Sequence, residues 1–175
     1  IINWCADAVQ FPERRTGDAL VMRSVEGVGK GTFVSLFGEI FGPHFLQVTN
    51  SDHLTGKFNA HMNANLILFA DEAFWGGNKQ SEGVLKGLIT EKYKMMEAKN
   101  FDAVLVENHT RIIMASNKDW IIPAGKSARR FMVFDVSSDR VNDYHYFKAI
   151  RDEWTNNGKE AFFKLLINRS IEDYH

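Results

Sequence analysis

The sequence has few of the residues that mark several common classes of protein. Among its 175 residues there are one cysteine, Cys5, and three prolines. A single cysteine excludes an internal disulfide and a zinc site built on several cysteines. The six histidines include no H-x-x-x-H pair, which argues against a structural metal site. No run of about 18 apolar residues is present, so we expect no transmembrane helix and no membrane partner.

The chain also lacks an excess of charge of either sign. It has 21 lysines and arginines against 22 acidic residues, for a formal net charge of −1. A protein that contacts nucleic acid with its whole surface is usually strongly basic. Any such contact must therefore come from a few locally placed basic side chains.

The start of the sequence, IINWCADAVQ, has no basic region and no long apolar run, so it does not read as a signal peptide. With the single cysteine, this predicts a reducing, cytoplasmic location, which would be the bacterial host cytoplasm if a phage or prophage encodes the protein. Because the first residue is Ile1 rather than methionine, we expect a fragment of a longer protein.

Apolar runs of strand length alternate with segments of helical periodicity. We expect strands at 19–24, 65–73, 110–117 and 130–136, and helices at 1–11, 31–42, 82–89, 143–154 and 159–168. The segment 92–108 alternates, turns around Lys99-Asn100 and alternates again, which predicts a β-hairpin. Buried strands that alternate with helices predict an α/β fold with a mainly parallel central sheet flanked by helices.

The stretch SVEGVGKGTF, residues 24–33, resembles a phosphate-binding loop of the form G-x-x-x-x-G-K-[ST]. Ser24 stands at the place of the first glycine and Gly31 at that of the magnesium-binding hydroxyl residue. A strand before the loop and a helix after it are the context that such a loop requires. Backbone N–H groups could then surround the β-phosphate, while Lys30 reaches the β- and γ-phosphates. The predicted nucleotide-binding residues are Glu26, Gly27, Val28, Gly29, Lys30, Gly31 and Thr32.

Polar residues end two of the other predicted strands. Asp71 and Glu72 follow the apolar run LILFA, which places both carboxylates at the carboxyl edge of the sheet, beside the loop. Asp71 would hold Mg²⁺ directly or through water, and Glu72 would polarise the water that attacks the γ-phosphate. Asn117 ends the run RIIMAS and could orient that water or contact the γ-phosphate. Each feature alone also fits a solvated turn.

Two arginines, Arg129 and Arg130, lie at the start of the strand predicted at 130–136. In isolation they fit a solvated loop. In a ring-forming ATPase, an arginine at this place can project into the site of a neighbouring subunit and neutralise charge in the transition state.

The order of these motifs resembles that of a superfamily 3 helicase domain, the AAA+-type motor of phage and viral primase-helicases. The matching segments are EGVGKGTF, GKFNAHMNANLILFADEA, LKGLITEKYKMMEAKNFDA, RIIMASN and ARRFMVFDV. The resemblance implies an AAA+-like P-loop NTPase fold with a hairpin inserted before the sensor strand and helices at the C-terminus. It also implies ATP and Mg²⁺ as cofactors and a homo-oligomer of six subunits. It further implies a fused or associated primase domain and 3′–5′ translocation on single-stranded DNA.

The resemblance also divides the chain and gives the hairpin a role. It implies the end of an upstream collar segment at 1–18, the ATPase core at 19–140 and a C-terminal helical segment at 141–175. A hairpin lysine would grip the DNA backbone in the central pore, with Lys99 as the first candidate and Lys94 behind it. Phe101 would stack on a base or else pack in the core.

Three readings of function remain open at this point. The first is an ATP-hydrolysing helicase motor. The second is a nucleotide-binding module without turnover that assembles into a ring and loads another protein. The third is a P-loop phosphotransferase, which would need no arginine from a neighbour. Thr32 stands one residue after the usual position and is the second predicted magnesium ligand beside Asp71. If its hydroxyl does not reach the ion, magnesium must rely on Asp71 and water.

Overall fold

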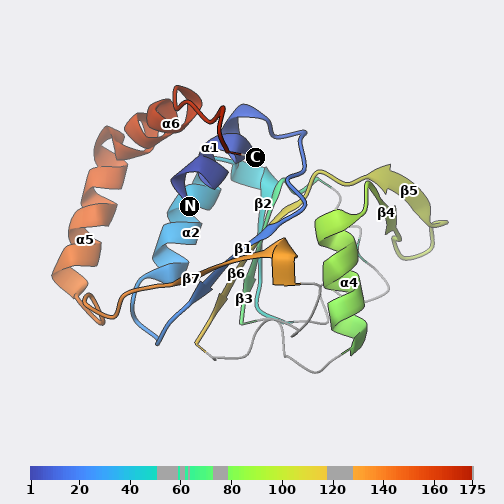
Figure 1. The fold of residues 1–175 in the computed structure, drawn as a ribbon, viewed down its shortest axis with the longest axis horizontal. Coiled ribbons are helices and arrows are strands. Elements are labelled where there is room, and N and C mark those ends of the chain that lie inside the picture. Colours follow the sequence, from blue (N-terminus) through green and yellow to red (C-terminus); the bar gives the residue numbers. More distant parts are fainter. Residues whose placement is uncertain (51–58, 60–61, 63, 73–78, 118–127, 175) are drawn as a thin grey trace.

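The computed structural model describes residues 1–50, 59, 62, 64–72, 79–117 and 128–174 (Figure 1). It confirms an α/β fold with a mainly parallel sheet flanked by helices, consistent with a P-loop-like architecture. The strands of the main sheet are β1 (Ala19–Arg23), β2 (Phe45–Val48), β3 (Ile67–Asp71), β6 (Arg111–Ser116) and β7 (Phe131–Asp135). The α-helices are α1 (Ile2–Gln10), α2 (Lys30–Glu39), α4 (Lys79–Thr90), α5 (Tyr144–Glu153) and α6 (Lys159–Ile167).

The sheet has the strand order β2-β3-β6-β1-β7, and every neighbouring pair is parallel. The sequence predicted four of these strands but not β2, which is short, lies at the edge and has largely half-buried side chains. Strand β6 lies between β1 and β3, so the carboxyl ends of these three strands meet at one edge of the sheet. Helix α2 follows β1 at that edge.

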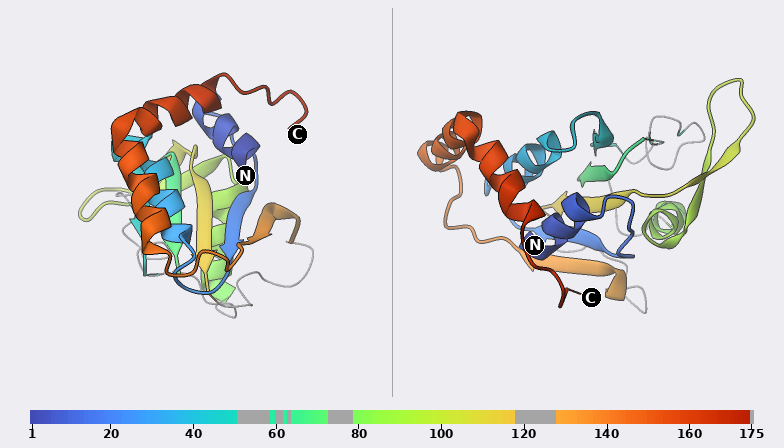
Figure 2. Two further views of the ribbon diagram at one scale, coloured as in Figure 1. Left: turned by 90° about the vertical axis from the view of Figure 1, so that its left-hand side faces the viewer. Right: turned by 90° about the horizontal axis from the view of Figure 1, so that it is seen from above.

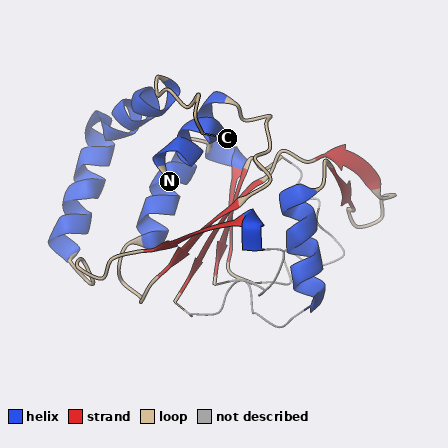
Figure 3. Ribbon diagram, in the orientation of Figure 1, coloured by secondary structure: helices blue, strands red, loops and turns tan. Residues whose placement is uncertain are grey.

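Side chains that alternate along the strands build a core on each side of the sheet. On β1, Ala19 and Val21 pack with residues of α4, while Leu20 and Met22 pack with α1, α2 and α6. Figure 3 shows α4 on one side of the sheet and the other helices on the opposite side. Because a strand repeats every two residues, burial on both faces makes β1 apolar almost throughout.

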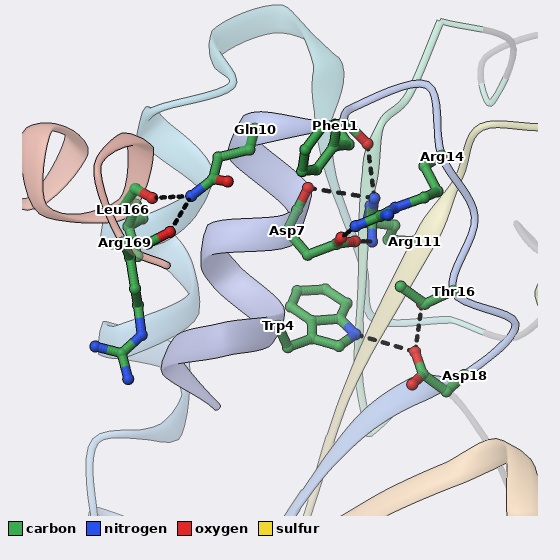
Figure 4. Close-up of polar contacts among 10 residues, drawn as sticks. All are labelled: Trp4, Asp7, Gln10, Phe11, Arg14, Thr16, Asp18, Arg111, Leu166 and Arg169. Carbon is green, nitrogen blue, oxygen red and sulfur yellow. Dashed lines mark hydrogen bonds and ion pairs between the residues drawn. The ribbon is translucent and has the colours of Figure 1, made fainter. Parts of the chain in front are cut away.

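Helix α1 packs into this core and against the C-terminal segment. Trp4 is fully buried in the cluster on the α2 side. Gln10 Nε2 donates to the carbonyl oxygens of Leu166, at 2.7 Å, and Arg169, at 2.8 Å (Figure 4). The two ends of the chain therefore cover the same part of the sheet. The proposed divisions at residues 18 and 140 stay predictions.

The predicted hairpin is present as strands β4 (Tyr93–Met96) and β5 (Val104–Glu107), which pair antiparallel apart from the main sheet. Asn100 lies in its turn with φ of 67°. Figure 2 shows the hairpin projecting from the body of the molecule. Asn59 braces it: its Nδ2 donates to Met95 O at 2.8 Å and its Oδ1 accepts from Glu97 N at 2.8 Å.

The two C-terminal helices are also present. Asp143 caps α5, since its carboxylate accepts a hydrogen bond from the Tyr146 N–H at 3.0 Å. The segment Trp154–Gly158, labelled η4, bends the chain between α5 and α6, with Asn157 at φ of 67°. Among the described residues, no helix has the length and apolarity needed to cross a membrane. Two short 3₁₀ segments complete the described elements, η1 (Gly42–His44) and η3 (Ala128–Arg130).

Candidate nucleotide-binding site

The predicted phosphate loop joins the end of β1 to the start of α2. Gly27 and Gly29 have φ of 76° and 90°, in the left-handed region that glycine adopts without a steric cost. A Cβ at Gly29 would collide with the Phe147 ring, and one at Gly27 with the Asn142 side chain. Both glycines are therefore required by the backbone conformation and by the close approach of the α5 segment.

Lys30, the first residue of α2, lies with its ammonium against the loop itself. Its Nζ donates to Ser24 O and to Val25 O, each at 2.8 Å. Partial burial lowers the pKa of Lys30, while the carboxylates of Glu72, Asp71 and Glu26 act in the opposite direction. These three acids therefore lie within electrostatic range of one lysine at the N-terminus of a helix.

Ser24, at the place of the first glycine of the motif, anchors the loop to two neighbouring strands. Its Oγ donates to Val136 O at 2.7 Å, just beyond β7, and its N–H donates to Ser116 O at 3.3 Å on β6. A glycine could make only the second of these bonds. The hydroxyl thus gives this departure from the motif a structural role.

Asp71 and Glu72 lie at the end of β3, one strand away from the loop. Asp71 is in register with Ala115 of β6, and Arg23 of β1 is in register with Ser116. Glu72 has φ of 53° and donates its N–H to Ala115 O at 3.0 Å. A left-handed backbone is uncommon for glutamate, and such conformations concentrate at functional sites.

A neighbouring strand contacts Asp71. Gln47, on the edge strand β2, donates from Nε2 to Asp71 Oδ2 at 3.1 Å. This bond fixes the carboxylate group on one side and leaves Oδ1 free of that contact. Gln47 carried no motif in the sequence, and only the pairing of β2 with β3 brings it to this place.

Asn117 joins the end of β6 to the phosphate loop. Its Nδ2 donates to Glu26 Oε1 at 2.8 Å. The structure thus brings Lys30, Asp71, Glu72 and Asn117 to one edge of the sheet, at or after the carboxyl ends of β1, β3 and β6, as parallel pairing requires. Gly31 and Thr32 lie in the first turn of α2, with Thr32 half-buried.

Arg129 and Arg130 lie at the opposite edge of the sheet from the loop. They form η3 directly before β7, and β7 runs parallel to β1, with Phe131 in register with Ala19. A five-residue strand spans about 17 Å, so neither arginine is placed to reach the loop of its own chain. Arg129 is exposed and Arg130 half-buried.

The three predicted DNA-binding residues differ in their surroundings. Lys99 is exposed in the hairpin turn, and Phe101 beside it is 75% exposed, so Phe101 does not pack in the core. Lys94 instead turns inward: its Nζ donates to Met62 O at 2.7 Å and to Thr110 Oγ1 at 3.0 Å. Burial lowers the pKa of Lys94. Its ammonium ties the hairpin to the core.

A pocket of about 530 Å³ adjoins the loop between α2 and the C-terminal helices. Val28, Gly29, Lys30 and Thr32 form its rim toward the loop. Its other walls are mostly apolar and include Ile1, Met22, Phe37, Val136, Tyr146, Phe147, Ile150, Trp154 and Phe162. Small-molecule sites are typically concave, mostly apolar and of this size. The pocket was not foreseen, because its walls come from distant parts of the sequence.

Most of the segment GKFN that was matched at residues 56–59 lies outside the described residues, and only Asn59 is placed. Its two hydrogen bonds to the hairpin give this residue a bracing role that the sequence did not show. Among the described residues, no group of three or more His, Cys, Asp or Glu side chains could hold a metal ion. A magnesium ion at this edge would therefore depend on few protein ligands.

Solved structures resemble this chain over almost its whole length. The apo structure of the NrS-1 C-terminal region (305–718) matches with a TM-score of 0.84 and 27% identity, over 99% of this chain and 42% of that one. Its A-form apo structure matches with a TM-score of 0.81 and 26% identity, over 99% and 41%. The chain thus spans about two fifths of the length of these structures. No curated protein sequence matches it.

The sequence also matches a family model, and the match contains most of the site. DUF5906, described as a family of unknown function, matches over residues 22–130, which include the phosphate loop, Asp71-Glu72 and Asn117. The matched part exceeds half of the chain. The protein therefore belongs to the DUF5906 family.

Proposed function

We propose that this chain is the ATP-hydrolysing motor domain of a phage-type replicative DNA helicase that works as a ring on single-stranded DNA. The observation that carries the proposal is the convergence of Lys30, the Asp71-Glu72 pair and Asn117 at the ends of three neighbouring parallel strands. The motif order of superfamily 3 helicases and the fold shared with the NrS-1 C-terminal region over 99% of the chain support it.

The geometry suits a nucleoside triphosphate. The backbone N–H groups of residues 26–31 and the N-terminus of α2 would bind the phosphates, since oriented amides and the helix dipole favour anions there. Lys30 would leave the carbonyls of Ser24 and Val25 for the β- and γ-phosphates. The base would enter the apolar pocket beside Gly29, where aromatic side chains offer stacking surfaces.

The acidic residues suit hydrolysis. Asp71, with Thr32, would hold Mg²⁺, an ion that prefers oxygen ligands and commonly binds through one or two carboxylates and the phosphates themselves. That ion would supply charge neutralisation at the phosphates. Glu72 would accept a proton from the attacking water, and Asn117 would orient that water or contact the γ-phosphate.

Two features fit a ring better than a single subunit. Arg129 and Arg130 lie at the edge of the sheet opposite their own loop, so a role in hydrolysis requires a neighbouring copy. The hairpin carries Lys99 and Phe101 in exposed positions away from the loop. In a ring, six hairpins would place their lysines in one pore. That pore would carry a local positive charge that a single near-neutral chain does not have.

The test is the rate of ATP hydrolysis per subunit across a dilution series, with and without single-stranded DNA. A rate that rises with protein concentration and with DNA is expected for a motor with shared sites. A constant, DNA-independent rate would instead indicate a self-contained phosphotransferase. ATP binding without hydrolysis under every condition would indicate the non-catalytic module. Lys30→Ala, which should lose ATP binding, is the control for contaminating ATPase.

A further inference from the structure

Glu26 is an acidic side chain within the phosphate loop, and no step of the proposed hydrolysis uses it. It lies between Val25 and Gly27 and is exposed. With Asp71 and Glu72 it makes three carboxylates that act on the single ammonium of Lys30. Asp71 has a use as a magnesium ligand and Glu72 as a base. Glu26 is a third carboxylate and lies in the loop itself, where its charge repels the phosphates that the loop would bind. Its presence there therefore needs an explanation.

The contact between Glu26 and Asn117 supplies that explanation. The Asn117 amide donates to Glu26 Oε1 at 2.8 Å. A carboxylate oxygen and a phosphate oxygen are both anionic acceptors with similar hydrogen-bond geometry. If Asn117 contacts the γ-phosphate, the second of the two roles given to it above, Glu26 Oε1 occupies the position of that phosphate oxygen as the acceptor of its hydrogen bond. Lys30 is likewise held by the loop, through two carbonyl oxygens.

We propose that Glu26 is a specificity-determining residue that substitutes for the γ-phosphate: it holds Asn117 when no triphosphate is bound, and ATP, but not ADP, must displace it. The proposal rests on the proposed function of the site. A diphosphate ends before the γ position and leaves the Glu26–Asn117 bond intact. A triphosphate gains the Asn117 bond only by breaking this one. Glu26 thus lowers the affinity for ATP more than that for ADP and makes the two affinities more alike. A motor whose two nucleotides bind with similar affinity can exchange them and does not stay in the ATP-bound state.

The test compares dissociation constants for Mg-ADP and for the non-hydrolysable ATP analogue with a β,γ-imido bridge, measured by calorimetry on the 175-residue chain. In Glu26→Ala both nucleotides should bind more tightly, because a negative charge is lost. The analogue should gain about three- to tenfold more than ADP, the usual range for one net hydrogen bond. Glu26→Gln, which keeps an acceptor but no charge, should show a smaller gain in this ratio. Exposed Glu160→Ala on α6 is the matched control.

The extra gain of the analogue over ADP should disappear when Glu26→Ala is introduced into Asn117→Ala, because the contact needs both partners, and only the gain from the lost charge, shared by both nucleotides, should remain. An analogue-to-ADP affinity ratio in Glu26→Ala within twofold of the parent would overturn the proposal, as would an extra gain of the analogue that survives in the double variant. Loss of binding of both nucleotides in Glu26→Ala would overturn it as well, since Glu26 would then assist binding. If the unaltered chain binds neither nucleotide, the proposed function itself fails. Because Glu26 is exposed, thermal unfolding of the variants should match that of the parent.

Discussion

Asp7 on α1 and Arg111 at the start of β6 form an ion pair that is shut off from water (Figure 4). Arg111 Nη1 lies 2.6 Å from Asp7 Oδ2, and the side chains are 2% and 0% exposed. Arg14 adds a second guanidinium to the same carboxylate, and Arg111 Nη2 also donates to Phe11 O at 2.8 Å. Burial, with a contribution from the charge of Arg14, lowers the pKa of Arg111 to about 10. Charge as well as packing therefore fixes α1 on the sheet.

Asp7→Asn should lower the free energy of unfolding by about 3–5 kcal/mol, because it leaves the Arg111 charge buried without its partner. Urea unfolding of the parent and the variant measures the difference. The matched control is Asp152→Asn, which breaks the exposed pair with Lys148 and should cost less than about 1 kcal/mol. An equally small loss at both positions would show that α1 is held by packing alone.

The buried thiol of Cys5 predicts a loss of stability at alkaline pH. Burial raises the pKa of Cys5 to about 12, from 9.0. The unfolded chain therefore releases this proton above about pH 9, while the folded chain keeps it until about pH 12. Its contribution is complete below pH 9 and is lost as the pH rises toward 12. Between pH 8 and pH 10 the loss should be about 1.4 kcal/mol.

Cys5→Ala should remove that part of the decline, and urea unfolding at both pH values measures it. The slope with pH is the quantity to compare, since the substitution also changes packing. Some decline should remain in the variant, because burial also raises the pKa of Tyr174 to about 12. A decline of the same size in parent and variant would mean that the Cys5 thiol does not titrate as its burial implies.

The strands that the sequence predicted are those with continuous apolar runs. Strands β1, β3 and β6 are buried on both faces, and β7, although an edge strand with alternating burial, carries four apolar residues in a row. Strand β2 was missed, since four residues at an edge carry little pattern. The loop, Asp71 and Asn117 follow from motif order, whereas the contacts of Gln47 and Glu26 depend on how neighbouring strands and loops come together.

The hairpin shows why the orientation of a side chain was harder to predict. The predicted DNA-binding role of Lys94 needs a side chain that faces solvent. The structure turns Lys94 inward, where an oxygen of Met62 and one of Thr110 accept its hydrogen bonds, while its neighbours Tyr93 and Met95 are 48% and 52% exposed. A lysine accepts such a position because buried acceptors satisfy its ammonium. Those acceptors come from other segments and are not visible in the local sequence.

Glu72→Gln should bind ATP with nearly the parental affinity and hydrolyse it at least about 100-fold more slowly, because an amide cannot accept the proton of the attacking water. Calorimetry with ATP and a phosphate-release assay separate the two effects. The exposed Glu153→Gln on α5 is the matched control and should leave both quantities unchanged. Parental turnover in Glu72→Gln would remove Glu72 from the role of base.

Arg130→Ala should lose hydrolysis and regain it when mixed with Glu72→Gln subunits. In the mixture, each Arg130→Ala subunit keeps an intact loop and Glu72, and a neighbouring Glu72→Gln subunit supplies the arginine. Arg129→Ala, tested in the same way, decides which arginine acts, and the exposed Arg151→Ala on α5 is the control. If no ratio of the two subunits restores phosphate release, the arginines do not act between subunits.

Lys99→Ala should leave basal ATP hydrolysis intact and abolish its stimulation by single-stranded DNA, because Lys99 lies on the hairpin, away from the loop. DNA affinity should also become less dependent on salt, because a protein that makes one phosphate contact fewer releases fewer counterions when it binds. The exposed Lys148→Ala on α5 should change neither quantity. Undiminished stimulation in Lys99→Ala would leave this lysine as an ordinary surface residue, and the pore contact would then have to come from other hairpin side chains such as Phe101.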